Sequence, residues 1–455
     1  PDFALANSHV RNDPSWKVSP VPRRLQNRHV DIGDTAPCKT ERFHRALLSS
    51  AQGIQVDFDD GNCPTFFNQI KGIFNIYQVV HNKVSGIPPI SKVPVLMLRP
   101  RAWNMVEHNM MINGREVPGP LFDYGLLMYH TGRKLYESES GPFFYLSKVE
   151  SSLEAKLWND IFVWTENKLN LPVGSIKATV LIESVLASFE MEEILYELKE
   201  HSAGLNCGIW DYSASFVNKF GHRQEFLLPD RSKYVNMEKL FLKSYMDLLV
   251  QTCHRRGALA TGGMAALLLP ENRASQEYQN VIEAVTRRAE SNTIQHFVFQ
   301  PVGSELLQYT YISVFALYLG EGHFFYCGKV EDSATAEISR SQVWWDASIS
   351  LSIIFLYRNI WFVGFNSCDI LRSARHMVTL IALPVQVWQW IRHQVRLEED
   401  NRTVTRSLVQ SLVKEVECEL AVEEKQRLHV AAEIFLEIVL KRDFPEFITT
   451  YLNLD

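Results

Sequence analysis

The stretch Ser175–Phe216 places the tightest constraint on how this 455-residue chain can fold. An apolar run at 176–182 ends on Glu183, an amphipathic segment follows, and a second apolar run at 204–209 leads to Asp211. This order predicts strand, helix and strand, and the two acids are 28 residues apart, about the length of one βαβ unit. Because parallel strands end at the same edge of a sheet, we expect both carboxylates at that edge, where they could bind a hard cation.

The same alternation recurs along the chain, with helix-like segments between most of the apolar runs. Eight runs occur, at 29–32, 54–58, 94–98, 176–182, 204–209, 258–264, 297–299 and 324–330. Eight βα units predict a closed (β/α)8 TIM barrel in the α/β class. An open doubly wound sheet is the alternative, but no GxGxxG loop follows an early strand to support it.

Catalytic groups of such barrels lie at the C-terminal ends of the strands. We number the eight runs as strands in chain order. Strand two ends in Asp57-Phe58-Asp59-Asp60, strand three in Arg99-Pro100-Arg101, strand four in Glu183, strand five in Asp211 and strand eight in Glu331-Asp332. One rim is therefore predicted to carry several acids and an arginine. Each group also has an ordinary alternative: the acids as helix caps, first-turn residues or a solvated loop, and the arginine as a salt-bridge partner.

Charge and cysteine usage narrow the class of partner. The net charge is −6 and no run of Lys or Arg is longer than a pair, so nothing indicates a nucleic-acid or membrane-surface role. A small-molecule partner is expected instead. The seven cysteines are scattered without a CxxC pair, which favours free thiols in a reducing compartment over disulfides or a zinc site.

Several long motifs carry a family resemblance. They are RPRAWN (99–104), GPLFDYGLLMYH (119–130), SGPFFYLSKVESSLEAKLWNDIF (140–162), IKATVLIES (176–184), FEMEEILYELKEHSAGLNCG (189–208), WDY (210–212), CHRRGALATGGMAA (253–266) and VEDSATAEISRSQVW (330–344). Through them the chain resembles the malate synthase family, in particular its shorter plant and bacterial class. The resemblance covers 1–344 and resumes at 388, and it implies a (β/α)8 barrel with a C-terminal helical plug.

The resemblance implies an acyltransferase of the glyoxylate cycle. Acetyl-CoA would condense with glyoxylate, and hydrolysis of the malyl thioester would give malate and CoA, with Mg²⁺ as cofactor. Because Mg²⁺ keeps several water or substrate oxygens, one or two carboxylates suffice, here Glu183 and Asp211. The backbone N–H groups of Gly208, Ile209, Trp210 and Asp211 match the family segment that holds the substrate carboxylate.

The resemblance also assigns the groups that act on acetyl-CoA. Asp332 corresponds to the base that removes a proton from the acetyl methyl group. Arg101 corresponds to the cation beside the developing enolate, whose charge it would stabilise. Pro301 matches a segment that contacts CoA, and Met264 is expected in the core, where it could touch the pantetheine arm.

Some residues near the proposed chemistry depart from the family pattern. Asp59 stands where the family has a Glu close to the metal, and Gly61, Ile209 and Gln300 replace a Ser, an Arg and a His. A catalytically impaired homologue that binds CoA or metal, and a non-catalytic interaction protein, therefore remain alternatives to an active malate synthase. The four main site residues are all retained, which favours the active enzyme.

The expected domains are an N-terminal segment at 1–27, a barrel at 28–344, an atypical apolar insertion at 345–387 and a helical plug at 388–455. The N-terminal segment is expected to be truncated, because the chain opens on Pro1. The insertion separates two copies of Gln-Val-Trp, and we favour an intron read through in a gene model over a real insertion. The two helices of the plug are expected at 405–420 and 423–440.

Location and assembly are weakly constrained by the sequence. The chain ends Asn453-Leu454-Asp455, which is not a Ser-Lys-Leu type peroxisomal signal. We expect a cytoplasmic or peroxisomal (glyoxysomal) protein without membrane association. The sequence is compatible with a homo-oligomer.

Overall fold

The computed structural model describes residues 8–262, with gaps at 27, 29–30, 63, 229–234 and 236–238, together with residue 276 and the segments 377–397, 401–419 and 425–445. The chain divides into two compact units. The first comprises 1–209 and 237–330 with Asp455, and the second comprises 210–236 and 331–454. The predicted domain boundaries stay a prediction.

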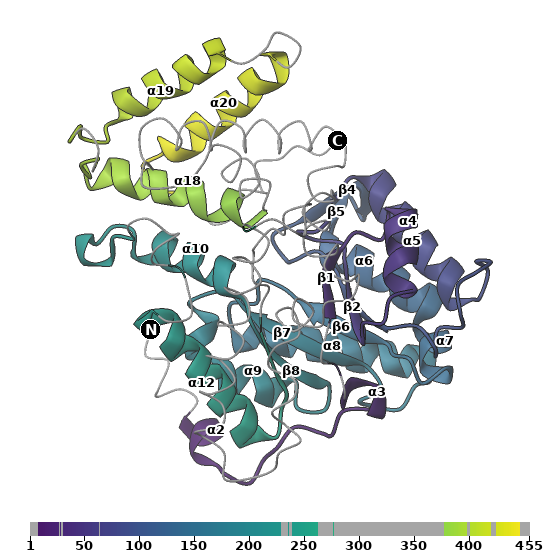
Figure 1. Cartoon of the computed structure of the whole chain (residues 1–455). Coiled ribbons are helices and arrows are strands. Elements are labelled where there is room, and N and C mark those ends of the chain that lie inside the picture. The colour runs from purple at the N-terminus through teal and green to yellow at the C-terminus, as the bar shows by residue number, and fades with distance from the viewer. Residues whose placement is uncertain are drawn as a thin grey trace. The chain divides into compact units, whose positions relative to one another are not determined.

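A parallel sheet forms the centre of the first unit (Figure 1). Its strands follow one another in chain order: β1 (Asp31–Thr35), β2 (Gly53–Asp57), β3 (Val95–Arg99), β6 (Phe143–Leu146), β7 (Lys177–Ile182), β8 (Ser202–Cys207) and β9 (Ala260–Gly262). Each strand pairs in parallel with the next. Strands buried on both faces need near-continuous apolar runs, and β3, β6 and β7 are buried throughout.

The strand prediction is confirmed for six of the eight runs, and the runs at 297–299 and 324–330 lie outside the described residues. It was wrong in omitting β6, which is only four residues long and follows Gly141-Pro142. A run this short does not stand out from its flanks. As a result, Glu183 follows the fifth strand of the sheet and Asp211 comes after the sixth, one strand later than predicted.

Helices cover the outer face of the sheet (Figure 1). The helical elements of the first unit are α2 (Ser8–Asn12), α3 (Arg23–Gln26), α4 (Thr40–Leu47), α5 (Phe66–Val80), α6 (Gly119–Leu127), the π-helical turn η1 (Met128–Gly132), α7 (Arg133–Glu137), α8 (Ser152–Leu169), the 3₁₀ turn η2 (Ala187–Phe189), α9 (Met191–Glu197) and α12 (Leu240–Arg256). Helix α5 begins where the Thr65 hydroxyl accepts a hydrogen bond from the Asn68 N–H, and α12 ends at Gly257 in the left-handed region.

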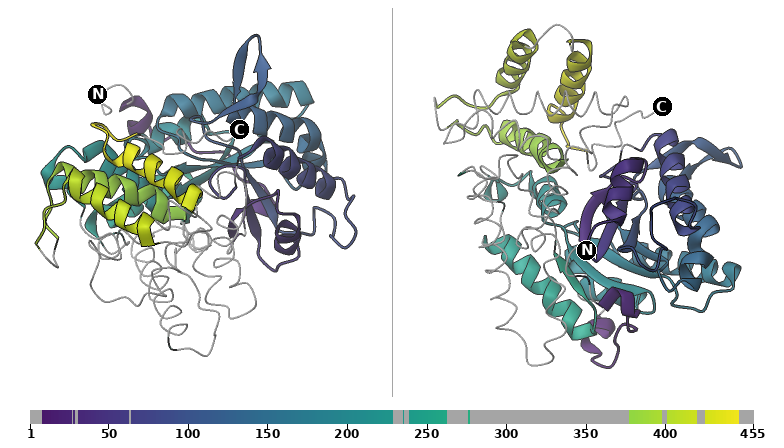
Figure 2. Two further views of the ribbon diagram at one scale, coloured as in Figure 1. Left: turned by 90° about the horizontal axis from the view of Figure 1, so that it is seen from above. Right: turned by 45° about the vertical axis from the view of Figure 1, so that its right-hand side comes forward.

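A β-hairpin interrupts the βα alternation between β3 and α6. Strands β4 (Val106–Ile112) and β5 (Arg115–Pro118) are antiparallel and are joined by Asn113-Gly114, both with positive φ, as a tight hairpin turn requires. The hairpin stands away from the helices in Figure 2. One of its side chains, Glu107, is nevertheless buried, and it contacts the candidate site described below.

The second unit is helical, with α10 (Ile209–Phe220), the 3₁₀ turn η3 (Gln224–Phe226), α18 (Met377–Arg392), α19 (Arg406–Glu419) and α20 (Lys425–Val439). The two predicted plug helices are confirmed as α19 and α20, which share a core around Val409, Leu412 and Phe435. Helix α18 runs through the predicted boundary at 387/388. In the described part of the chain, no helix is long and apolar enough to cross a membrane.

Gly204 offers a test of the sheet. It lies in β8 with φ of 110°, and a Cβ added there would overlap the carbonyl oxygen of Leu259. We expect Gly204→Ala to lower the free energy of unfolding by about 3 kcal/mol, because strain and overlap add at a buried strand. Urea unfolding followed by circular dichroism measures this change.

Gly125 is the matched control, because a Cβ there meets nothing within 4 Å on helix α6. Gly125→Ala is expected to raise stability by about 0.5 kcal/mol. Equal effects of the two substitutions would contradict the described packing of β8.

Candidate active site

The loop after β2 is held in shape by its first acid. Asp57 is fully buried, and its two carboxylate oxygens accept hydrogen bonds from the N–H groups of Asp59 (2.8 Å) and Gly61 (2.6 Å). The chain therefore turns tightly at the carboxyl end of the strand. This turn keeps Asp59 and Asp60 at the edge of the sheet, where the sequence predicted a group of acids.

Two cations from neighbouring strands meet these acids. Arg99, the last residue of β3, contacts Asp57 and Asp59 at 3.4 Å and Asp60 at 2.5 Å. Lys148, two residues after β6, places its Nζ 2.9 Å from Asp59 and 2.6 Å from Asp60. Burial raises the pKa of the Asp60 carboxyl, but Lys148 and Arg99 outweigh it and hold that pKa at about 2.

The backbone of Lys148 extends the cluster to the next strand. Its N–H donates to Glu183 Oε1 at 2.6 Å, and its φ of 53° lies in the left-handed region, which is uncommon for a residue other than glycine. Beside it, the Ser147 hydroxyl donates to Asp59 Oδ2 at 2.9 Å. One residue thus links the ends of β2, β6 and β7 through its side chain and its backbone.

The surroundings of Glu183 fit a divalent cation. Gly208, just after β8, lies so close that a Cβ there would be 2.9 Å from Glu183 Cβ and 3.4 Å from Oε2, so only glycine leaves this space open. The four carboxyl groups of this edge, those of Glu183 and the three aspartates of the loop, outnumber the two cations Arg99 and Lys148. A divalent ion would reduce that imbalance.

Among the described residues, no group of three or more Asp, Glu, His or Cys side chains has an arrangement that could hold a metal ion by itself. A site for Mg²⁺ does not require such a cage, because Mg²⁺ retains water and substrate oxygens and uses one or two carboxylates.

Arg101 lies in a different set of contacts. Its Nη2 and Nε bind the two oxygens of Asp123 at 2.9 and 3.0 Å, and its Nη1 lies 3.0 Å from Glu107 of the hairpin. Its guanidinium also lies 5.5 Å from the ring of Phe122. Two buried carboxylates therefore neutralise Arg101, whereas Arg99 is the arginine that faces the acids of the sheet edge. The catalytic role of Arg101 stays a prediction.

The remaining predicted residues fall into three groups. Gly208 and Ile209 follow β8 in the first unit, and the Ile209 side chain is buried. Trp210 and Asp211 lie in the first turn of α10, in the second unit, so the pairing of Asp211 with Glu183 stays a prediction. Met264, Pro301 and Asp332, together with Gln300, lie outside the described residues.

Sequence reasoning placed Arg99 at the rim without giving it a role, and it missed Lys148. Side chains alternate along a strand, and Val95 and Met97 both belong to a buried core cluster, so the same parity points Arg99 to that face. Phe143 and Tyr145 of the same core cluster likewise point Ser147 inward. Parity within each strand would have found Arg99 and Ser147, but not Lys148.

Comparison with known proteins identifies the family of this chain. The family model "Malate synthase, TIM barrel domain" matches residues 95–295, and "Malate synthase, C-terminal" matches 347–454. Malate synthase of Dictyostelium discoideum is 35% identical over 96% of this chain and 84% of its own length. Malate synthase of Streptomyces clavuligerus is 35% identical, over 98% of this chain and 87% of its own length.

Malate synthase A of Escherichia coli is 30% identical over 99% of this chain and 87% of its own length. The chain therefore belongs to the malate synthase family, and its fold is a (β/α)8 TIM barrel with a C-terminal helical domain, as the sequence predicted.

Removal of the Lys148 ammonium tests the cluster. We expect Lys148→Met to lower the free energy of unfolding at pH 7 by about 3 kcal/mol, because Asp59 and Asp60 would lose a buried partner. Asp60 has a pKa lowered from 3.8 to about 2, so its ionisation stabilises the fold above pH 3.8, and that stabilisation is lost as the pH falls toward 2. In Lys148→Met this loss between pH 4 and pH 2 should be smaller, as measured by urea unfolding at each pH.

Lys156→Met is the matched control, because Lys156 pairs with Asp160 on the exposed side of α8. Its unfolding curve should overlay that of the wild type at every pH. A Lys148→Met protein with wild-type stability and wild-type acid dependence would contradict the described cluster.

Proposed function

We propose that this protein is a malate synthase, which condenses acetyl-CoA with glyoxylate and hydrolyses the malyl thioester to malate and CoA. Membership of the family over nearly the whole chain supports this proposal. The observation that carries it is the buried cluster at the carboxyl ends of β2, β3, β6 and β7, where enzymes with this fold perform their chemistry.

Glu183 and Asp211 are proposed to hold Mg²⁺. When bound, Mg²⁺ supplies Lewis-acid polarisation of the glyoxylate carbonyl. The chain's own contribution is to fix Glu183, because the Lys148 N–H engages Oε1 and leaves Oε2 on the side of Gly208. The excess of negative charge around Glu183 favours a divalent cation over a univalent one.

The segment 208–211 is proposed to bind the glyoxylate carboxylate through backbone N–H groups. The family has an arginine where this chain has Ile209, whose side chain is buried. The substitution therefore replaces a charge with core packing, and the backbone of the segment keeps the binding role. The start of helix α10 also favours an anion, because the N-terminus of a helix carries partial positive charge.

Proton removal from acetyl-CoA is assigned to Asp332 by the resemblance. A carboxylate is a weak base for a methyl proton, so the enolate needs a cation close to its oxygen. Arg101, carried over from the resemblance, is the proposed cation, and its pairing with Asp123 and Glu107 holds the guanidinium at the base of the β4–β5 hairpin. Arg99 and Lys148 are paired in the same way with the aspartates of the β2 loop.

CoA release from acetyl-CoA that depends on both glyoxylate and Mg²⁺ tests the function. Glu183→Gln should lower kcat/KM by at least about a hundredfold and weaken Mg²⁺ binding measured by calorimetry, since a neutral amide binds Mg²⁺ poorly.

Glu137→Gln serves as the control, because Glu137 lies exposed on α7, away from the sheet edge. It should leave both quantities unchanged. A folded wild-type protein that binds Mg²⁺ but releases no CoA would instead select the catalytically impaired homologue.

A further inference from the structure

A buried chain of hydrogen bonds connects the loop after β2 with Arg101, and Gln69 of helix α5 is its middle member. The Gln69 side chain is buried. Its Oε1 accepts a hydrogen bond from Asn62 Nδ2 at 2.6 Å, and its Nε2 donates to the Phe58 carbonyl oxygen at 3.0 Å. The same Nε2 lies 3.4 Å from both carboxylate oxygens of Asp123. Gln69 therefore bridges the β2 loop and helix α6.

The chemistry of its neighbours fixes the orientation of the Gln69 amide. A carboxylate and a backbone carbonyl only accept hydrogen bonds, so both require the NH₂ end of the amide. The Oε1 end then faces Asn62, whose own Oδ1 accepts from the Cys38 thiol at 3.1 Å. A neutral amide donates at one end and accepts at the other, and it adds no charge beside Asp123.

The two ends of this chain belong to the two halves of the proposed site. Asn62 closes the turn of the acidic loop, since its N–H donates to the Asp59 carbonyl oxygen at 3.2 Å. Asp123 accepts from the Arg101 backbone N–H at 2.9 Å and from its Nε and Nη2 at 3.0 and 2.9 Å. Burial raises the pKa of Asp123 and Arg101 opposes this rise, while the charge of Asp59 adds to it. The halves are thus also coupled electrostatically.

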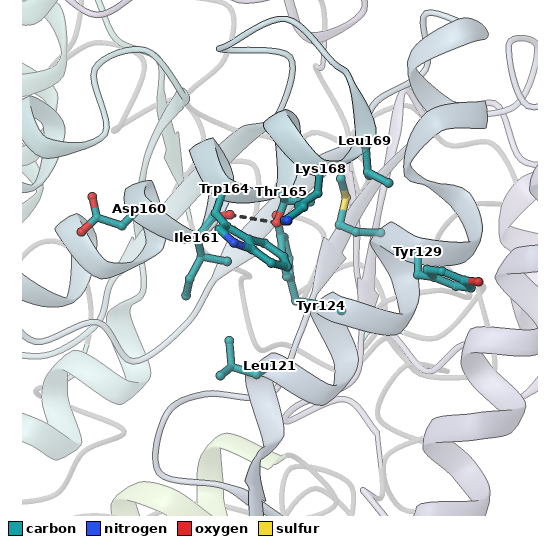
Figure 3. A pocket seen from close by; sticks show the side chains of 11 residues that line it. Leu121, Tyr124, Tyr129, Asp160, Ile161, Trp164, Thr165, Lys168 and Leu169 are labelled. Atoms are coloured by element: carbon teal, nitrogen blue, oxygen red, sulfur yellow. Dashed lines mark hydrogen bonds between the residues drawn. The ribbon is translucent and has the colours of Figure 1, made fainter. Parts of the chain in front are cut away.

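Helix α6, which carries Asp123, is only partly packed against α8. A cavity of about 760 Å³ with a mainly apolar lining opens between α6 with η1 and α8 (Figure 3). At its start, α6 lies close to Arg101, because a Cβ at Gly119 would be 3.1 Å from Arg101 Nε. The hydrogen bonds of Asp123 therefore contribute to the position of α6, since contacts with α8 leave a space on another side.

We propose that Gln69 is a positioning residue, which fixes Arg101 relative to the acids of the β2 loop. Asn62 connects Gln69 to the loop, and Asp123 connects it to Arg101. The inference rests on the proposed function, in which the metal and glyoxylate lie at the acids and Arg101 acts on the enolate of acetyl-CoA. Bond formation between the two reactants needs a defined geometry, and a misplacement of about 1 Å can cost roughly a hundredfold in rate.

The substitution Gln69→Met tests this role, because Met is a similarly long, unbranched side chain without the amide. We expect kcat for glyoxylate-dependent CoA release, per folded protein, to fall at least about tenfold. The KM for glyoxylate should change by less than about twofold, since the groups around Glu183 keep their contacts. Steady-state kinetics of the full chain, with the folded fraction measured by circular dichroism, gives both values.

A double-mutant cycle shows whether Gln69 acts through Arg101. In the Arg101→Lys background, Gln69→Met should lower kcat by less than about threefold, because the cation that Gln69 positions is already altered. A residue that only stabilises the fold would lower kcat by the same factor in both backgrounds.

Asn75→Leu is the matched control on the same helix. Asn75 is also a buried amide, but its Nδ2 donates to the Pro37 carbonyl oxygen at 2.8 Å and to Thr40 Oγ1 at 3.0 Å, away from Asp123. Its substitution should lower stability and leave kcat per folded protein unchanged. If Gln69→Met does not fold, Asn62→Ala removes the donor that orients the amide and should lower kcat at least about threefold.

Two results would overturn the positioning role while the proposed function stands. One is a wild-type kcat in the folded Gln69→Met or Asn62→Ala protein, and the other is an equal loss in the wild-type and Arg101→Lys backgrounds. A wild-type protein without CoA release that depends on glyoxylate would overturn the proposed function, and the positioning role with it.

Discussion

The buried ammonium group of Lys148 is the interaction on which the candidate site depends. It lies between Asp59 and Asp60, and without it the three carboxylates of the loop after β2 would keep Arg99 as their one cationic contact among those described. Through its backbone the same residue also orients Glu183. Stability and the proposed metal binding are therefore coupled at one position, because the cation that neutralises the buried acids belongs to the residue that positions the proposed ligand.

Periodicity and motif matches predicted the class of fold and the placement of Glu183 at a strand end, and both agree with the structure. They could not predict which groups neutralise one another. Arg99 and Arg101 are two residues apart, yet one faces the acids of the sheet edge and the other faces Asp123 and Glu107. That difference depends on how the β4–β5 hairpin and α6 pack against the end of β3. Such packing between separate elements is not encoded in a local sequence pattern.

The position of Lys148 in the site could not be predicted from the sequence, because its local structure leaves no clear pattern. Strand β6 is too short to give a clear apolar run, and the left-handed conformation at Lys148 has no simple signature in a residue that is not glycine. The contacts of Asp59 explain how an aspartate can stand where the family has a glutamate. Its carboxylate accepts hydrogen bonds from Lys148 and Ser147, so the shorter side chain helps to hold the strand ends together.

The central claim is that the acids at this sheet edge hold a divalent cation at Glu183, and the most direct test is crystallographic. Crystals grown with Mn²⁺ as a stand-in for Mg²⁺ should show an anomalous difference peak within about 2.5 Å of Glu183 Oε2 and of an Asp211 oxygen. That peak should be absent from Glu183→Gln crystals. An ordered site without the peak, or a peak bound by neither carboxylate, would contradict the account.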